Sequence, residues 1–144
     1  MHTATNWFTW ALLSALFAAL TTVFAKVGLA DVDADLATFI RTVVIVVLLG
    51  AVILATGKWT SPLQLTPRTL GFLVLSALAT GASWICYFRA LKAGDAALVA
   101  AVDKSSLLLV ALFAVAFLGE RPAPRQWIGF SLLAAGVLTL GWRH

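Results

Sequence analysis

Residues 96–118 read AALVAAVDKSSLLLVALFAVAFL, and this stretch decides which kind of fold the chain can adopt. A helix of about 20 mainly apolar residues crosses the hydrocarbon core of a bilayer, so the run is long enough to do so. Asp103 and Lys104 lie near its centre, where ionisable side chains are rare and face protein or water. We therefore predict a membrane-spanning helix that turns its charged residues away from lipid.

Four more apolar runs of comparable length lie at residues 7–26, 36–56, 69–91 and 126–142. Short segments with charged, glycine or proline residues separate them, as expected of the turns between helices. The chain is therefore predicted to be an all-α, polytopic integral membrane protein with five transmembrane helices. Residues 1–144 are predicted to form a single transmembrane domain.

The composition excludes most other classes of protein. Of the 144 residues, 62% are hydrophobic and 11% are charged, and the mean hydropathy is +1.00. A soluble domain has about 25% charged residues, and a chain this short buries only about two-thirds of its surface on folding. The net charge of +4 is then better explained by bilayer interfaces than by a nucleic-acid partner.

The sequence also argues against an enzyme. Cys86 is the single cysteine, and His2 and His144 stand at the two chain ends, so no metal-binding set is expected. We find no nucleophile–base pair and no phosphate-binding loop. The prediction is therefore a non-enzymatic chain without a cofactor or a bound metal.

Positive residues, which usually set membrane orientation, are evenly divided in this chain. The N-terminal side carries Lys58, Arg68, Arg121 and Arg125, and the opposite side carries Lys26, Arg89, Lys92 and Arg143. This balance arises by chance in a protein of fixed orientation, or it reflects dual topology, in which the chain inserts both ways and pairs with an inverted copy.

Asp103 and Lys104 are the first candidates for a substrate-binding or proton-coupling site. Adjacent residues on a helix point about 100° apart, so the two are not expected to face each other. Each then needs a partner from another helix or a second subunit. The alternative is a buried ion pair that only holds helices together.

Three more residues are candidates for the same site. Arg41 lies a few residues inside its span, where it is an interface anchor or a partner for Asp103 or an anionic substrate group. Trp84 and Tyr87 share one helix face with Thr80 and are candidates to line a solute pocket; packing is the alternative.

The fifth span is rich in small residues, among them Gly129 and Gly136. Small residues let helices approach closely in a membrane. We therefore take these two glycines as the candidate dimer contact, although packing within the chain or a lipid-facing helix fits as well.

In the order and spacing of its motifs, the chain resembles one EamA-type repeat of the drug/metabolite transporter superfamily. The resemblance is carried by residues 10–28, 87–95, 102–121, 126–129 and 135–138. Most EamA proteins hold two such repeats in ten helices, so the resemblance implies that this five-helix chain forms a homodimer, with its two copies antiparallel.

The function implied is transport of a small organic solute, a metabolite or a drug, by alternating access through a cavity near the middle of the bilayer. A facilitative pore and a non-transporting partner subunit of a heteromeric complex are the alternatives. The expected location is the cytoplasmic membrane of a bacterial or archaeal cell.

Overall fold

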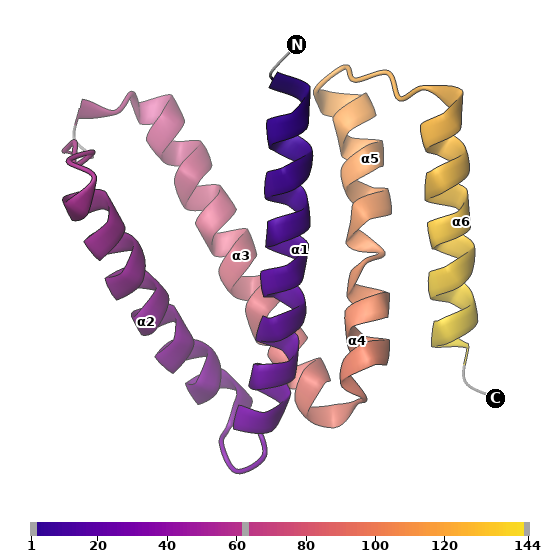
Figure 1. Ribbon diagram of the computed structural model, residues 1–144, viewed down its shortest axis with the longest axis horizontal. Helices are drawn as coiled ribbons and strands as arrows, with labels where there is room; N and C mark the ends of the chain where they lie inside the picture. Colours follow the sequence, from indigo (N-terminus) through magenta and orange to yellow (C-terminus); the bar gives the residue numbers. More distant parts are fainter. Residues whose placement is uncertain (1–2, 62–63, 143–144) are drawn as a thin grey trace. The chain divides into compact units, whose positions relative to one another are not determined.

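The computed structural model describes residues 3–61 and 64–142, with side chains described from Trp7 onward. His2, Arg143 and His144 lie outside the described residues. Every regular element in the described part is helical, apart from short turns (Figure 1). The helices are α1 (Thr3–Gly28), α2 (Ala34–Ala55), α3 (Pro67–Ala93), α4 (Ala96–Asp103), α5 (Ser106–Phe117) and α6 (Pro124–Gly141).

Short polar signals start several of the helices. The Asp33 carboxylate accepts hydrogen bonds from the backbone N–H groups of Asp35 and Leu36, which caps α2. Proline is the first residue of both α3 and α6. A backbone N–H at this position has no partner within the helix, so its absence does not destabilise the helix. In α6 the Gln126 side chain also accepts a 2.7 Å bond from the Ala123 backbone N–H.

Two glycines follow helix ends in the left-handed region of backbone conformation. Gly57 has a φ of 63° just after α2, and Gly119 has a φ of 66° just after α5. This conformation ends a helix at little cost only when no Cβ is present. The chain therefore leaves both helices at positions that the sequence marks.

The chain divides into two compact units, Met1–Ala93 and Gly94–His144, which are described separately. In the first unit α3 contacts both α1 and α2. The buried side chains of this unit all lie where α1 ends, α2 begins and α3 ends. They are Ala25, Leu29, Ala34, Thr38, Phe88 and Leu91. The first unit is therefore held together mainly at one end of its helices.

In the second unit, the run predicted as one helix from 96 to 118 is broken. The α-helical pattern stops at Asp103 and resumes at Ser106, and Figure 1 shows the irregular turn between α4 and α5. The Ser105, Leu107 and Leu108 N–H groups each bond to the carbonyl three residues earlier, as in a 3₁₀ turn. The break falls on the polar Asp-Lys-Ser-Ser segment. Aspartate and serine are more favourable in caps and turns than in the interior of a helix.

α6 packs against both α4 and α5 within this unit. A Cβ added at Gly141 would lie 3.9 Å from Cγ2 of Val102 on α4. Ala111 and Ala114 of α5 are the buried apolar residues in the described part of the unit.

Large apolar side chains are exposed along every helix, from Trp10 in α1 to Leu138 in α6. Four segments are long and apolar enough to cross a membrane: Trp7–Gly28, Ala34–Ala55, Pro67–Ala93 and Ala96–Phe117. α6 is not one of these four among the described residues, because Arg125 and Gln126 in its first turn lower its apolar content. The fifth transmembrane span stays a prediction.

Candidate functional site

A cavity with a volume of about 600 Å³ lies between α2 and α3 in the first unit. Its lining is Asp35, Thr38, Phe39, Thr42, Leu73, Ser76, Ala77, Thr80, Gly81, Trp84 and Ile85. Cavities that hold small organic ligands span roughly 300–1,000 Å³ and combine apolar walls with a few polar groups. This cavity has both the size and the mixture of a small-molecule site.

The hydroxyl groups in this cavity have a defined role. Thr38 donates to the Ala34 carbonyl at 2.8 Å, Thr42 to the Thr38 carbonyl at 2.8 Å, and Thr80 to the Ser76 carbonyl at 2.9 Å. A threonine hydroxyl has one hydrogen to donate and two lone pairs to accept with. Because the hydrogens are engaged by the helices, the oxygens are left to accept from a solute.

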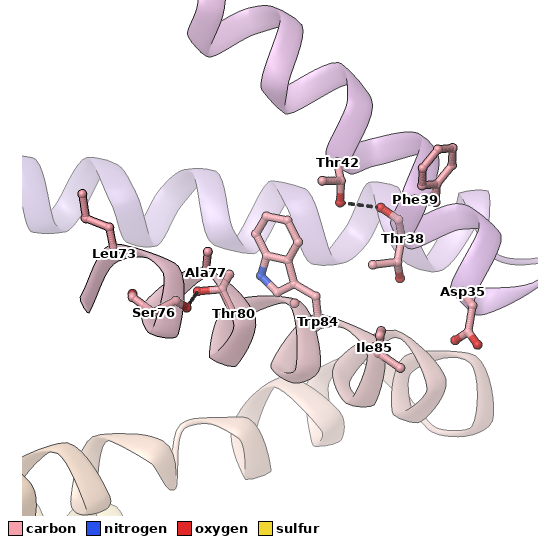
Figure 2. Close-up of a pocket in the computed structure, with 11 residues that line it drawn as sticks. Asp35, Thr38, Phe39, Thr42, Leu73, Ser76, Ala77, Thr80, Trp84 and Ile85 are labelled. Atoms are coloured by element: carbon pink, nitrogen blue, oxygen red, sulfur yellow. Dashed lines mark hydrogen bonds between the residues drawn. The ribbon is translucent and has the colours of Figure 1, made fainter. Parts of the chain in front are cut away.

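Trp84 gives the cavity its aromatic wall. Figure 2 shows its indole ring extending from α3 toward α2, opposite Thr38 and Thr42. The ring is half-buried. An indole in this position offers a flat apolar surface on which the body of an organic solute can stack.

An ion pair joins the same two helices at one end of the cavity. Arg89 Nε lies 2.9 Å from Asp35 Oδ1, and the Arg89 terminal nitrogen lies 2.6 Å from Asp35 Oδ2. Two parallel bonds of this kind fix both the position and the plane of the partners. Arg89 therefore joins α3 to the start of α2.

Arg41 lines a second cavity, of about 380 Å³, formed by α1, α2, α3 and the connection after α1. Its lining is Thr21, Phe24, Ala25, Gly28, Val32, Ala37, Ile40, Arg41 and Phe88. The guanidinium carbon lies 4.4 Å from the centre of the Phe88 ring and 5.8 Å from that of Trp84. Both distances are within the range of cation–π attraction.

Tyr87 does not share the cavity with Trp84, although the two were predicted on one face. Its hydroxyl forms a 2.8 Å hydrogen bond with the Thr22 hydroxyl of α1. Lys26 donates to the Leu91 carbonyl at 2.7 Å, and Lys92 donates to the Val32 carbonyl at 2.6 Å. These three contacts attach α3 to α1 and to the segment before α2, at the end where the unit is buried.

Asp103 and Lys104 lie in the second unit, at the break between α4 and α5. The prediction that they do not face each other was wrong, because Lys104 Nζ lies 3.9 Å from Asp103 Oδ2. Lys104 is the C-cap residue of α4, and its long side chain brings its ammonium group near the carboxylate of the preceding residue. The separation is too long for a hydrogen bond, and both side chains are partly exposed.

Gly129 and Gly136 lie in α6 with no described atom within 4 Å of an added Cβ. Neither glycine is therefore needed for close packing within the second unit. Their role as a dimer contact stays a prediction.

The sequence reasoning missed the contribution of α2. Asp35, Thr38 and Thr42 line the larger cavity, yet none of them was a candidate. A signal was present, because the three polar residues recur at intervals of three and four in an otherwise apolar helix and so share one face.

Comparison with known proteins shows which family of membrane proteins the chain resembles. The model of the EamA-like transporter family matches residues 5–142. A Sinorhizobium protein described as an uncharacterized transporter in the cobO 3′ region is 57% identical over 135 residues, which are 94% of this chain and 96% of that protein. YwfM of Bacillus subtilis (strain 168), also described as an uncharacterized transporter, is 28% identical over 69% of this chain and 34% of its own length.

No solved structure matches the chain. The family match and the four apolar helices identify an integral membrane protein, and the family supports a transporter rather than an enzyme. The chain belongs to the EamA-like transporter family, as its motifs predicted.

Proposed function

We propose that the chain carries a small organic solute across the membrane by alternating access, as one half of an antiparallel homodimer of ten helices. The observation that carries the proposal is the cavity between α2 and α3, whose apolar wall, Trp84 ring and accepting hydroxyls suit an organic solute. Such a cavity within transmembrane helices is where transporters hold their cargo.

The broken helix of the second unit supports movement as well as binding. Transporter sites are commonly formed by discontinuous helices, and a 3₁₀ segment inside a helix often marks a hinge. Here the break coincides with Asp103 and Lys104, in a segment long and apolar enough to span the membrane. We propose that these two residues take part in substrate binding or coupling.

The dimer is proposed from the number of repeats and the charges. One EamA domain covers nearly the whole chain, whereas the stretch shared with the Bacillus protein is 34% of that protein. A second copy would supply a second repeat. The even division of Lys and Arg residues supports an inverted second copy, and the bacterial relatives support a location in the cytoplasmic membrane.

Counterflow in proteoliposomes tests the transport proposal. Vesicles are preloaded with an unlabelled amino acid, organic acid, organic amine or neutral organic solute, and uptake of the labelled solute is followed. We expect saturable uptake that is faster in preloaded vesicles for at least one class. A non-saturating uptake without acceleration would identify a pore instead, and no uptake above that of protein-free vesicles would overturn the proposal.

The dimer is tested on the purified chain. We expect chemical crosslinking to give a dimer without any other protein, and reporters fused to the C-terminus to be active on both sides of the membrane. A strictly monomeric chain, or one that is stable only with a different chain, would contradict the homodimer. Reporter activity on one side only would contradict the antiparallel arrangement.

A further inference from the structure

We propose that the smaller cavity of the first unit binds the carboxylate group of an amphipathic organic acid, and that Arg41 recognises it. The inference deepens the proposed function, because it names a class of solute for a transporter of organic solutes. It rests on the charge, the contacts and the surroundings of one side chain.

Among the described residues, Arg41 has aromatic neighbours but no hydrogen-bond acceptor. Its guanidinium lies over the Phe88 ring at 4.4 Å, and within residues 3–61 and 64–142 it makes no hydrogen bond or ion pair. A guanidinium has five N–H donors in its plane, whereas an aromatic face attracts the positive charge without accepting those hydrogens at its edge. The ring therefore orients the group and leaves its donor edge available.

The cavity also lacks a negative charge to balance Arg41. None of its lining residues is acidic. Asp35, the second residue of α2, is engaged by Arg89 through two hydrogen bonds. A cation inside a membrane span is normally paired, so the missing anion is expected to come from a ligand.

The chemistry of the cavity selects among anions. A planar guanidinium matches the two oxygens of a carboxylate. Apart from Thr21 and Gly28, the remaining walls are aromatic and aliphatic, with Phe24, Val32 and Ile40 among them. The volume of about 380 Å³ suits a small molecule. The ligand that fits is therefore an acid with a compact apolar body.

Three probes with the same body separate charge from hydrophobicity: 3-phenylpropionate, 3-phenylpropanol and 3-phenylpropylamine. Their binding is measured by calorimetry at neutral pH, with the full-length protein in maltoside micelles that contain no phosphate. We expect the acid to bind at least about tenfold more tightly than the alcohol, as a charge-assisted pair implies, and the amine to bind more weakly still. Equal binding of acid and alcohol would overturn the inference.

Substitutions then assign the preference to Arg41. In Arg41→Gln we expect the preference for the acid to disappear. Arg68→Gln is the matched control, because Arg68 is exposed at the opposite end of α3 and outside both described cavities, and it should keep the preference. An Arg41→Gln protein that still favours the acid, or an Arg68→Gln protein that loses the preference, would overturn the assignment.

Arg41→Lys keeps the test decisive if Arg41→Gln aggregates in size-exclusion chromatography. Lysine retains the charge but not the planar fork, so we expect a preference that is reduced several-fold but present. Unchanged affinity for the acid would contradict fork recognition. Binding of an anionic phospholipid that depends on Arg41, without binding of the acid, would identify a lipid site and overturn the proposal.

The binding and counterflow experiments distinguish failure of the acid-binding proposal from failure of the transport proposal. Saturable counterflow of neutral solutes or amines, together with no preference for the acid, would leave transport standing and remove the role of Arg41. Absence of counterflow for every solute class would remove transport, whatever the binding preference.

Discussion

Two acid–base pairs of this membrane protein differ in what they hold together. Asp35 and Arg89 come from different helices of the first unit and meet through two hydrogen bonds of 2.6 and 2.9 Å. Asp103 and Lys104 are neighbours in sequence at a helix break in the second unit, and their charged atoms approach no closer than 3.9 Å. The first pair is bidentate, with two parallel hydrogen bonds, whereas the second forms no hydrogen bond.

The difference indicates different uses of charge. A bidentate pair between helices constrains their relative position, and changing it disturbs packing. A pair within one turn joins no helices, so each member remains free to accept another partner. We therefore expect loss of the first pair to lower stability and loss of the second pair to impair transport.

The largest expected effect is on transport. Asp103→Asn or Lys104→Ala should abolish counterflow while membrane insertion and monodispersity remain as in the wild type, because each removes a charge at the helix break. Asp95→Asn is the matched control, since Asp95 precedes α4 and makes no side-chain capping bond. Wild-type counterflow in either variant would remove the pair from the proposed site.

The interhelical pair should affect stability. Arg89→Gln removes both hydrogen bonds to Asp35 and leaves the Asp35 carboxylate without its partner, so we expect a lower melting temperature. Thermal unfolding followed by circular dichroism measures the change. Arg68→Gln, which removes the same charge at the other end of α3, is the control. Equal melting temperatures of the two variants would show that the pair does not stabilise the first unit.

The proposed dimer contact lies in α6, which carries neither of the two charge pairs. Gly129→Val or Gly136→Val should lower the crosslinked fraction of the purified chain, because a larger side chain separates helices that approach closely. Gly50→Val in α2 is the control, since an added Cβ there also meets no described atom within 4 Å. If all three variants crosslink as the wild type does, the contact lies elsewhere.

The smallest expected effect concerns a neutral hydrogen bond of the first unit. Tyr87→Phe removes the bond to Thr22 and should lower the free energy of unfolding by about 1 kcal/mol. The same substitution in a Thr22→Val protein should have little further effect. Two independent losses of similar size would show that the hydroxyls do not stabilise each other.

Much of the fold was predictable because helix length and hydropathy are local properties. The spans at 7–26, 36–56 and 69–91 lie within α1, α2 and α3 to within a residue, and proline and glycine mark several of the limits. The break at Lys104–Ser105 was not predicted, because a polar pair inside an apolar run fits both a continuous helix and an interrupted one.

The candidate site residues were predictable only as residue types on a helix face. Trp84 lines the cavity between α2 and α3, whereas Tyr87 bonds to α1, and the binding of a solute by either residue stays a prediction. The Asp35–Arg89 pair joins residues far apart in sequence, so no spacing rule could reveal it. Partners across helices depend on how the helices cross and rotate, which a single helix does not encode.

The apolar runs are enough to predict membrane-spanning helices, because bilayer thickness and backbone hydrogen bonding leave few other solutions. Which polar groups are engaged and which remain available follows only from how the helices pack. This packing pairs Asp35 with Arg89 and places Arg41 against Phe88 with no acceptor in the described part of the chain. The reason is that the partners of a charged group depend on which side chains the packing of the helices brings near it.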